Sequence, residues 1–319
     1  MRVRRAGLGA AAVLLALLTG GCVSLPQSEA LRENPPANLT ARVELARVPY
    51  HAQEDYLCGP SSLAMAFNAA GVPASVESLT PQVYLPGRKG SLQAEMLGAT
   101  RRAGLVAYTA QPNLEALMRE LAAGTPAVVL LNLGVGWWPI WHYAVVIGYD
   151  LDRRKFILRS GRKEREEWSF SLFEYSWRDG GDWSLLALPP GRIPATASEA
   201  DFPSAVAALE RAGKTREARV AYRALLERWP DSLVGLIGLG NVEYALGDPG
   251  AAEAALRRAA AAHPGSGAAL NNLAYVLAER GKLGEAETTA RAAVALGGPT
   301  LEEARKTLDA ILARRLSRP

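Results

Sequence analysis

A period of 34 residues in the last third of the chain constrains the fold more than any other feature of the sequence. Glycine and alanine each recur at this spacing, and a proline closes every unit after 34 or 35 residues. The three columns are Gly213, Gly247 and Gly281; Ala218, Ala252 and Ala286; and Pro230, Pro264 and Pro299. A fixed period of this length is typical of repeat architectures whose units stack on one another and share a continuous core.

Each unit fits two helices joined at the glycine, because apolar residues follow helical spacing on both sides of it, as around Leu236 and Leu256. The pattern resembles the tetratricopeptide repeat, which predicts an all-α domain over residues 201–316. Residues 300–315 should form a helix that caps the last repeat. An ordinary helical bundle is the alternative. The inner-surface positions expected to hold a partner peptide or protein are Asn241, Tyr244, Asn271 and Tyr275.

A single thiol, Cys58, stands just before a predicted helix. Pro60 suits the first turn of a helix, residues 61–70 are rich in helix formers, and Gly71 supplies a stop. The free N–H groups and the positive end of the helix dipole stabilise a thiolate at this position, which lowers a cysteine pKa from about 8.5. The alternative is a buried structural cysteine that acts as a small apolar residue.

Gln53 lies five residues before the thiol, and its amide is expected to stabilise an oxyanion formed when the thiolate attacks a carbonyl. The order Gln, four residues, Cys-Gly and an Ala/Ser/Leu-rich helix resembles the papain-like peptidases of the bacteriocin-processing, double-glycine-leader family. The likeness covers residues 46–190. It implies a papain-like α+β fold, with cleavage of peptides after small residues such as Gly-Gly.

The order of elements agrees with that fold class. Helices are predicted at residues 91–103 and 113–123, after the Cys58 helix. Buried strands are then predicted from short apolar runs; these are residues 126–133, 142–149, 155–158 and 183–188. Helices followed by an antiparallel sheet make an α+β domain.

His142 is the predicted general base, since it opens a strand in the sequence His-Tyr-Ala-Val-Val, which resembles the family's His-aromatic-x-Val-Val pattern. A satisfied core histidine and a role for His51 are the alternatives. The family carries Asp or Asn where the returning strand lies opposite the histidine, and this chain has Ser160 there. Ser160 is therefore the expected, weaker orienter of the imidazole. Asp150 lies at the far end of the His142 strand and is excluded by distance.

Three tryptophans precede His142 in the stretch Gly-Val-Gly-Trp137-Trp138-Pro-Ile-Trp141. The rings either pack inside the domain or line a groove for an apolar substrate segment.

The N-terminus reads as an export signal. Arginines precede an apolar run over residues 8–18, which is shorter than the roughly 20 residues that span a bilayer. Thr19-Gly20-Gly21-Cys22 resembles the lipobox of bacterial lipoproteins, which implies cleavage after residue 21 and a lipid on Cys22. A plain secretory signal is the alternative. Residues 22–45 are predicted to be a flexible tether and residues 191–200 a linker.

Composition excludes several partners. The sequence has 36 Lys and Arg against 32 Asp and Glu, so it lacks the large excess of positive charge typical of nucleic-acid-binding proteins. Gly213-Lys214-Thr215 lacks the rest of a phosphate-loop motif. No nucleotide, cofactor or metal is expected. The sequence predicts an outer-membrane lipoprotein facing the periplasm that is a cysteine peptidase with docking repeats. The alternative is an adaptor that keeps the fold, binds peptides and assembles envelope proteins without turnover.

Overall fold

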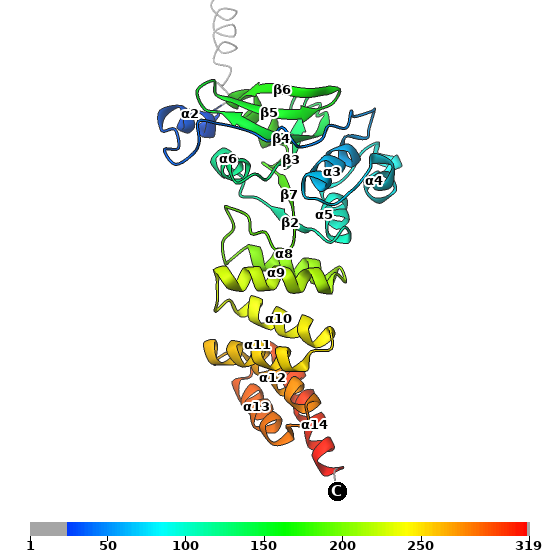
Figure 1. Cartoon of the computed structure of the whole chain (residues 1–319), viewed down its shortest axis with the longest axis vertical. Coiled ribbons are helices and arrows are strands. Elements are labelled where there is room, and N and C mark those ends of the chain that lie inside the picture. Colours follow the sequence, from blue (N-terminus) through cyan, green and yellow to red (C-terminus); the bar gives the residue numbers. More distant parts are fainter. Residues whose placement is uncertain (1–23, 318–319) are drawn as a thin grey trace, which may run out of the picture.

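The computed structural model describes residues 24–317, which form an α+β domain followed by a stack of helices along the long axis of the molecule (Figure 1). The predicted signal peptide and Cys22 lie outside the described residues. Within residues 24–317, no helix combines the length and apolar composition that a bilayer crossing requires.

The α+β domain is built on one antiparallel sheet with the strand order β2-β7-β3-β4-β5-β6, to which β1 adds by pairing with β4. Its strands in the described chain are β1 (Arg42–Glu44), β2 (Val106–Thr109), β3 (Ala127–Asn132), β4 (Trp141–Asp150), β5 (Lys155–Ser160), β6 (Lys163–Ser169) and β7 (Ser184–Leu188). The four predicted strands correspond to β3, β4, β5 and β7. The sequence analysis missed β1, β2 and β6.

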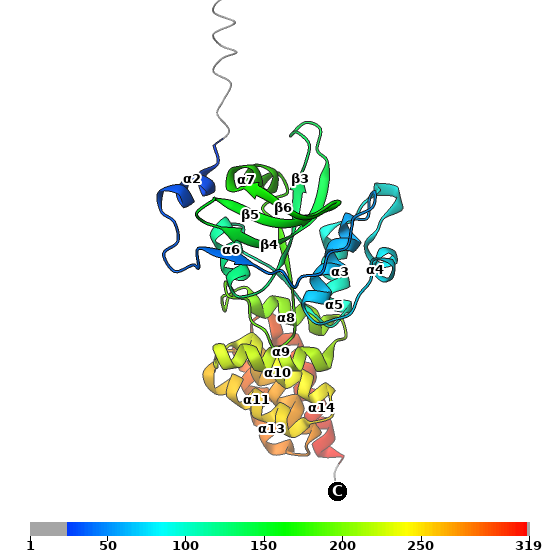
Figure 2. The ribbon, with the colours of Figure 1, turned by 45° about the horizontal axis from the view of Figure 1, so that its top comes forward.

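Helices cover both faces of this sheet, because alternate strand residues point to opposite sides. Val128 and Leu130 face α3 (Cys58–Ala69), α4 (Val76–Val83) and α5 (Gln93–Arg102). Val129 and Leu131 face α6 (Leu114–Ala122) and α7 (Phe170–Asp179). Figure 2 shows α3 and α5 on one side of the sheet and α6 on the other. The predicted helices at 91–103 and 113–123 are α5 and α6, whereas α4 and α7 were not predicted.

The predicted tether is wrong for residues 24–45. Residues 26–33 form α2 (Pro26–Glu33), which packs on α6 and α7, and Ser28 is buried there. The Ser28 backbone N–H donates to the Glu174 carboxylate at 2.7 Å, and its hydroxyl donates to the same oxygen at 2.5 Å. β1 then adds to the sheet with Val43 opposite Tyr149. Polar composition suggested an extended chain, but this carboxylate supplies the polar contacts that dock the segment.

The repeats follow the predicted period. Their helices are α8 (Phe202–Arg211), α9 (Thr215–Arg228), α10 (Leu233–Ala245), α11 (Pro249–Ala262), α12 (Gly267–Glu279), α13 (Leu283–Leu296) and α14 (Leu301–Leu316). Gly213, Gly247 and Gly281 each adopt a positive φ between paired helices, a conformation that glycine reaches without steric cost. The alanine column is fully buried. α14 packs on α12 and α13 as the predicted capping helix.

The two parts share one hydrophobic core. The cluster on the α6 side of the sheet continues into the repeats through Phe202 and Leu225. The Phe202 ring packs edge-on against Tyr108 of β2, with ring centroids 6.0 Å apart. Within the repeats it also packs at a tilt against Trp229, with ring centroids 6.3 Å apart. Between the α+β domain and the repeats, the backbone N–H of Thr196 in the predicted linker donates to the buried Glu120 carboxylate at 2.7 Å. The linker is therefore held against the α+β domain.

Candidate active site

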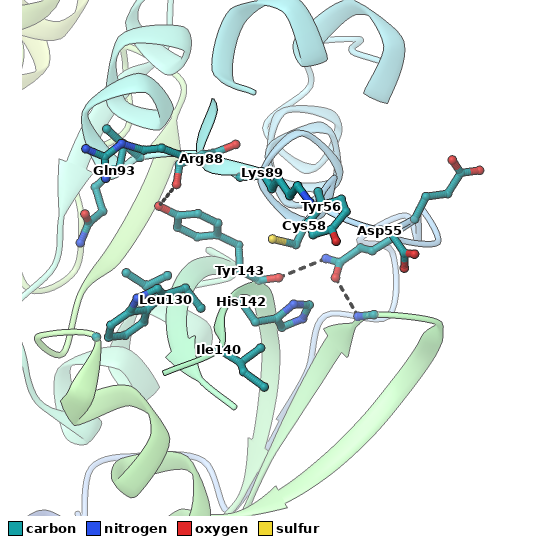
Figure 3. A pocket seen from close by; sticks show the side chains of 18 of the residues that line it. Asp55, Tyr56, Cys58, Arg88, Lys89, Gln93, Leu130, Ile140, His142 and Tyr143 are labelled. Carbon is teal, nitrogen blue, oxygen red and sulfur yellow. Dashed lines mark hydrogen bonds between the residues drawn. The ribbon is translucent and has the colours of Figure 1, made fainter. Parts of the chain in front are cut away.

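A pocket of about 960 Å³ opens between the first turn of α3 and the start of β4 (Figure 3). Cys58, His142 and Gln53 line it, together with two loops that the sequence analysis did not single out, residues 54–56 and 88–93. The structure thus brings the three principal residues predicted from sequence to one cavity.

Cys58 is the first residue of α3, so the expected helix N-terminus is present, two residues earlier than Pro60 suggested. Burial raises the pKa of the Cys58 thiol, and the backbone N–H groups of Tyr143, Gly59 and Cys58 itself only partly oppose this. The expected lowering of the Cys58 pKa is therefore wrong. The helix end supplies a favourable field, but the loss of water around the sulfur is the larger effect.

His142 lies near the start of β4, opposite Leu131 of β3. Its Nε2 is 3.1 Å from the Ser160 hydroxyl oxygen, so Ser160 contacts the imidazole as predicted. Burial lowers the pKa of His142 to about 4, against a small opposing effect of the Glu166 carboxylate. His142 is therefore neutral at pH 7, and its Nδ1 is the nitrogen left for a reacting group.

Cys58 and His142 are arranged as a neutral pair. Figure 3 shows the sulfur on the α3 side of the pocket and the imidazole on the β4 side. Within the described residues, no hydrogen bond joins Cys58 Sγ to either ring nitrogen of His142. With the Cys58 pKa raised and the His142 pKa lowered, thiol and imidazole are the stable forms at neutral pH. A base can still remove the thiol proton during attack, without a preformed ion pair.

The Gln53 side chain makes hydrogen bonds that were not predicted from the sequence. Its Nε2 donates to the Ser62 hydroxyl and to the Tyr143 carbonyl, both at 3.2 Å. Its Oε1 accepts the N–H of Gly161 at 2.8 Å. The buried amide thus ties α3, β4 and the β5–β6 turn together. The backbone N–H groups of Tyr143, Gly59 and Cys58 approach the sulfur and are available as donors there.

Other candidates fall outside this centre. His51 does not line the pocket, and its Nε2 lies 3.4 Å from the Asn68 amide. The Asp150 carboxylate accepts the N–H of Arg153 at 2.8 Å, at the opposite end of β4 from His142. Ser91, which no motif indicated, is among the residues that line the pocket, and its buried hydroxyl lies beside Gly59 without a hydrogen-bond partner.

The tryptophans before His142 do not pack in the core. Trp141 and Ile140 line the pocket, whereas Trp137 and Trp138 lie at the tip of the β3–β4 hairpin outside it. For Trp137 and Trp138 both expectations are wrong, because the rings neither pack in the core nor line the pocket.

The four predicted docking residues lie on α10 and α12. The Tyr244 and Tyr275 hydroxyls are 3.3 Å apart, and Asn241 accepts a hydrogen bond from Asn272 at 3.0 Å. Asn271 is half-buried, and its side-chain oxygen has no partner. The structure brings these side chains together across two neighbouring helices.

Comparisons with known proteins also divide the chain into the α+β domain and the repeats. Residues 45–182 match the Peptidase_C39 like family, and residues 200–232 and 237–299 match tetratricopeptide repeat families. The chain combines a C39-like peptidase domain with tetratricopeptide repeats. No match was found among curated proteins.

Solved structures cover the two domains separately. A putative C39-like peptidase from Bacillus anthracis is 18% identical, with a TM-score of 0.40, over 47% of this chain and 98% of its own. The Yersinia enterocolitica type III secretion chaperone SycD, in complex with a peptide of the translocator YopD, is 23% identical with a TM-score of 0.33. This match covers 35% of this chain and 91% of the chaperone.

Proposed function

We propose that the protein is a membrane-anchored cysteine peptidase. The observation that carries this proposal is the presence of Cys58, at the first turn of α3, and His142, held by Ser160, in one open pocket. The match of residues 45–182 to a peptidase family supports it.

The reaction begins with the neutral pair. Cys58 Sγ attacks the peptide carbonyl as its proton passes to Nδ1 of His142, and the oxyanion is stabilised by the N–H groups that open α3. The imidazolium then gives this proton to the leaving amine as the C–N bond breaks, which leaves a thioester on Cys58. Water attacks the thioester with His142 as base, and the acid product and the free thiol result.

The repeats are proposed to dock the substrate or a protein partner. Tetratricopeptide repeats form curved surfaces that hold extended peptides. Tyr244 and Tyr275 with Asn241 and Asn271 offer hydrogen-bonding groups on neighbouring helices. The likeness to double-glycine-leader peptidases suggests cleavage after small residues.

Anchoring through a lipid on Cys22 would place the enzyme at the cell envelope, on the periplasmic face of the outer membrane. The lipobox-like stretch before Cys22 supports this location.

Cleavage of a peptide library by the purified full chain, read by mass spectrometry, tests the peptidase. We expect products from the parent chain and none from a Cys58→Ala variant purified in the same way. Equal product from both chains would remove the assignment.

An adaptor without turnover is the second candidate. It is favoured by the raised Cys58 pKa, the serine that stands opposite His142, and the engaged amide of Gln53. Alkylation of Cys58 by iodoacetamide against pH separates the two. A peptidase should react at pH 7 at a rate that falls in a His142→Ala variant, whereas an adaptor should react only well above the free-cysteine pKa of about 8.5 in both chains, because burial raises the pKa of this thiol.

A further inference from the structure

The turn between β3 and β4 exposes an unusually apolar surface. Residues 133–141, named here the tryptophan hairpin, carry no charged side chain. Trp137 is 85% exposed and Trp138 is 68% exposed. The other large apolar side chains exposed in the tryptophan hairpin are Leu133, Val135, Ile140 and Trp141. A contiguous exposed patch of this kind marks an interaction site.

The tryptophan hairpin is an ordered feature. Asn132 at its base accepts hydrogen bonds from the N–H groups of Gly134 and Ile140, both at 2.9 Å. Nearer the tip, the N–H of Trp138 donates to the Val135 carbonyl at 2.8 Å, and the reverse bond is 3.2 Å. A Cβ at Gly134 would overlap the Trp138 carbonyl, so this close turn requires glycine. The fold therefore holds the two rings out in water.

The same helix supports both the tryptophan hairpin and the emerging N-terminus. Near the end of α7, Arg178 donates to the carbonyl of Ser24, the first described residue, at 2.8 Å. The next residue, Asp179, accepts a hydrogen bond at 2.9 Å from the Asn132 amide, which holds the hairpin. Figure 2 shows the hairpin tip and the start of α2 at the end of the molecule away from the repeats.

Chain length then restricts where a membrane can lie. Only Val23 separates Ser24 from Cys22, and an extended chain spans about 3.5 Å per residue. A lipid on Cys22 would hold Ser24 within roughly 10 Å of the bilayer surface. The end of α7 that binds Ser24, and the tryptophan hairpin fixed to that end, would face the lipid headgroups.

We propose that the tryptophan hairpin inserts into the interfacial layer of the phospholipid membrane that carries the lipid anchor. The inference rests on the anchor assigned under the proposed function. Tryptophan rings favour the bilayer interface, where an apolar body and a polar N–H are both satisfied. A second contact also fixes orientation, which a single flexible anchor leaves free. A peptide substrate is the less favoured occupant, because Trp137 and Trp138 lie outside the pocket lining.

Tryptophan quenching in vesicles tests the insertion. The full chain, purified with its native N-terminal processing, is mixed with vesicles of phosphatidylethanolamine and phosphatidylglycerol that contain doxyl-labelled phospholipid. We expect the quenched fraction of emission to fall at least threefold in a Trp137→Ala/Trp138→Ala variant. A Trp229→Phe variant, altered in the repeats, is the matched control and should keep the parent's quenched fraction. Quenching should also be stronger with a doxyl group near the headgroup than deep in the acyl chain.

Equal quenching of the parent and the double variant overturns the insertion. A double variant that instead cleaves a soluble peptide more slowly, in the absence of vesicles, would identify a substrate-binding hairpin and also overturn it. The mass of the N-terminal peptide reports the lipid on Cys22 separately. If quenching depends on the hairpin but Cys22 carries no lipid, the insertion is supported and the lipid anchor is wrong. If Cys22 carries a lipid but quenching does not depend on the hairpin, only the insertion is wrong.

Discussion

The ionisable groups of the pocket and the buried Glu253 carboxylate of the repeats have opposite surroundings. In the pocket, burial holds the Cys58 thiol and the His142 imidazole neutral, and Ser91 keeps an unpartnered hydroxyl. In the repeats, the buried Glu253 carboxylate is hydrogen-bonded by Arg257, Arg280 and Lys282. Burial alone would raise the Glu253 pKa, but the hydrogen bonds from Lys282 and Arg257 outweigh it and bring the pKa to about 2.

The contrast shows where the fold leaves interactions for a ligand. A carboxylate with three cationic partners has no capacity left and contributes to stability. The Cys58 thiol and the His142 imidazole line an open pocket, and under the proposed function they would gain interactions when a substrate enters. Substitutions at His142, Glu253 and Ser160 perturb each side of this contrast.

Replacement of His142 should have the largest effect. Loss of the base is expected to lower kcat/KM by about 10²- to 10⁴-fold in His142→Ala. The parent should lose activity as the pH falls through the His142 pKa of about 4, because the protonated ring cannot accept the thiol proton. Rates on a cleaved peptide between pH 3 and 8 measure both. His51→Ala is the matched control and should retain the parent's rate and profile; an unchanged rate in His142→Ala would contradict the assignment.

Replacement of Glu253 should cost stability rather than activity. Glu253→Gln is expected to lower the free energy of unfolding by about 2 kcal/mol at pH 7. Because the folded pKa lies below the ordinary value of 4.5, the carboxylate's contribution is complete above pH 4.5 and is lost as the pH falls towards 2. The difference between parent and variant should therefore shrink over that window in urea titrations. Glu302→Gln, at an exposed pair with Lys306, should change stability by less than about 0.5 kcal/mol.

Changes at Ser160 should have the smallest effect and act through His142. Ser160→Ala removes the hydroxyl 3.1 Å from Nε2 and should lower kcat/KM about tenfold, since the ring is less well oriented. Ser160→Asp places a carboxylate there, which stabilises the imidazolium and raises the His142 pKa. The acid limb of the pH–rate profile should then move upwards from about pH 4. A limb that stays fixed in Ser160→Asp would show that Ser160 does not act on His142.

Local patterns predicted a large part of this structure. The Gly213 column located the turn between the paired helices of each repeat, because a left-handed turn favours glycine. The return of β5 beside β4 brought Ser160 to His142, as counting residues along the hairpin suggested. These features depend on neighbours in sequence or on one strand pairing.

The missed features depend on partners that are distant in sequence. Glu174 lies 146 residues after Ser28, and no local pattern reveals that it docks α2. The sequence predicts Gln53 as an oxyanion donor, but in the folded domain its amide is hydrogen-bonded to Tyr143 and Gly161. The direction of the Cys58 pKa shift depends on how much protein surrounds the sulfur, which only the packed domain determines. The position of Cys58 at a helix N-terminus predicted a contribution that lowers its pKa, but burial raises the pKa by more.

The ring of Phe202, wedged between Tyr108 and Trp229, also limits how the molecule can move. A swing of the repeat stack about residues 189–201 would pull the Phe202 ring away from Tyr108 of β2 and expose both rings to water. The stack therefore behaves as a rigid arm, and a chain gripped on α10 and α12 would reach the sulfur only if its own length matched the span. Such an arm selects by distance as well as by chemistry.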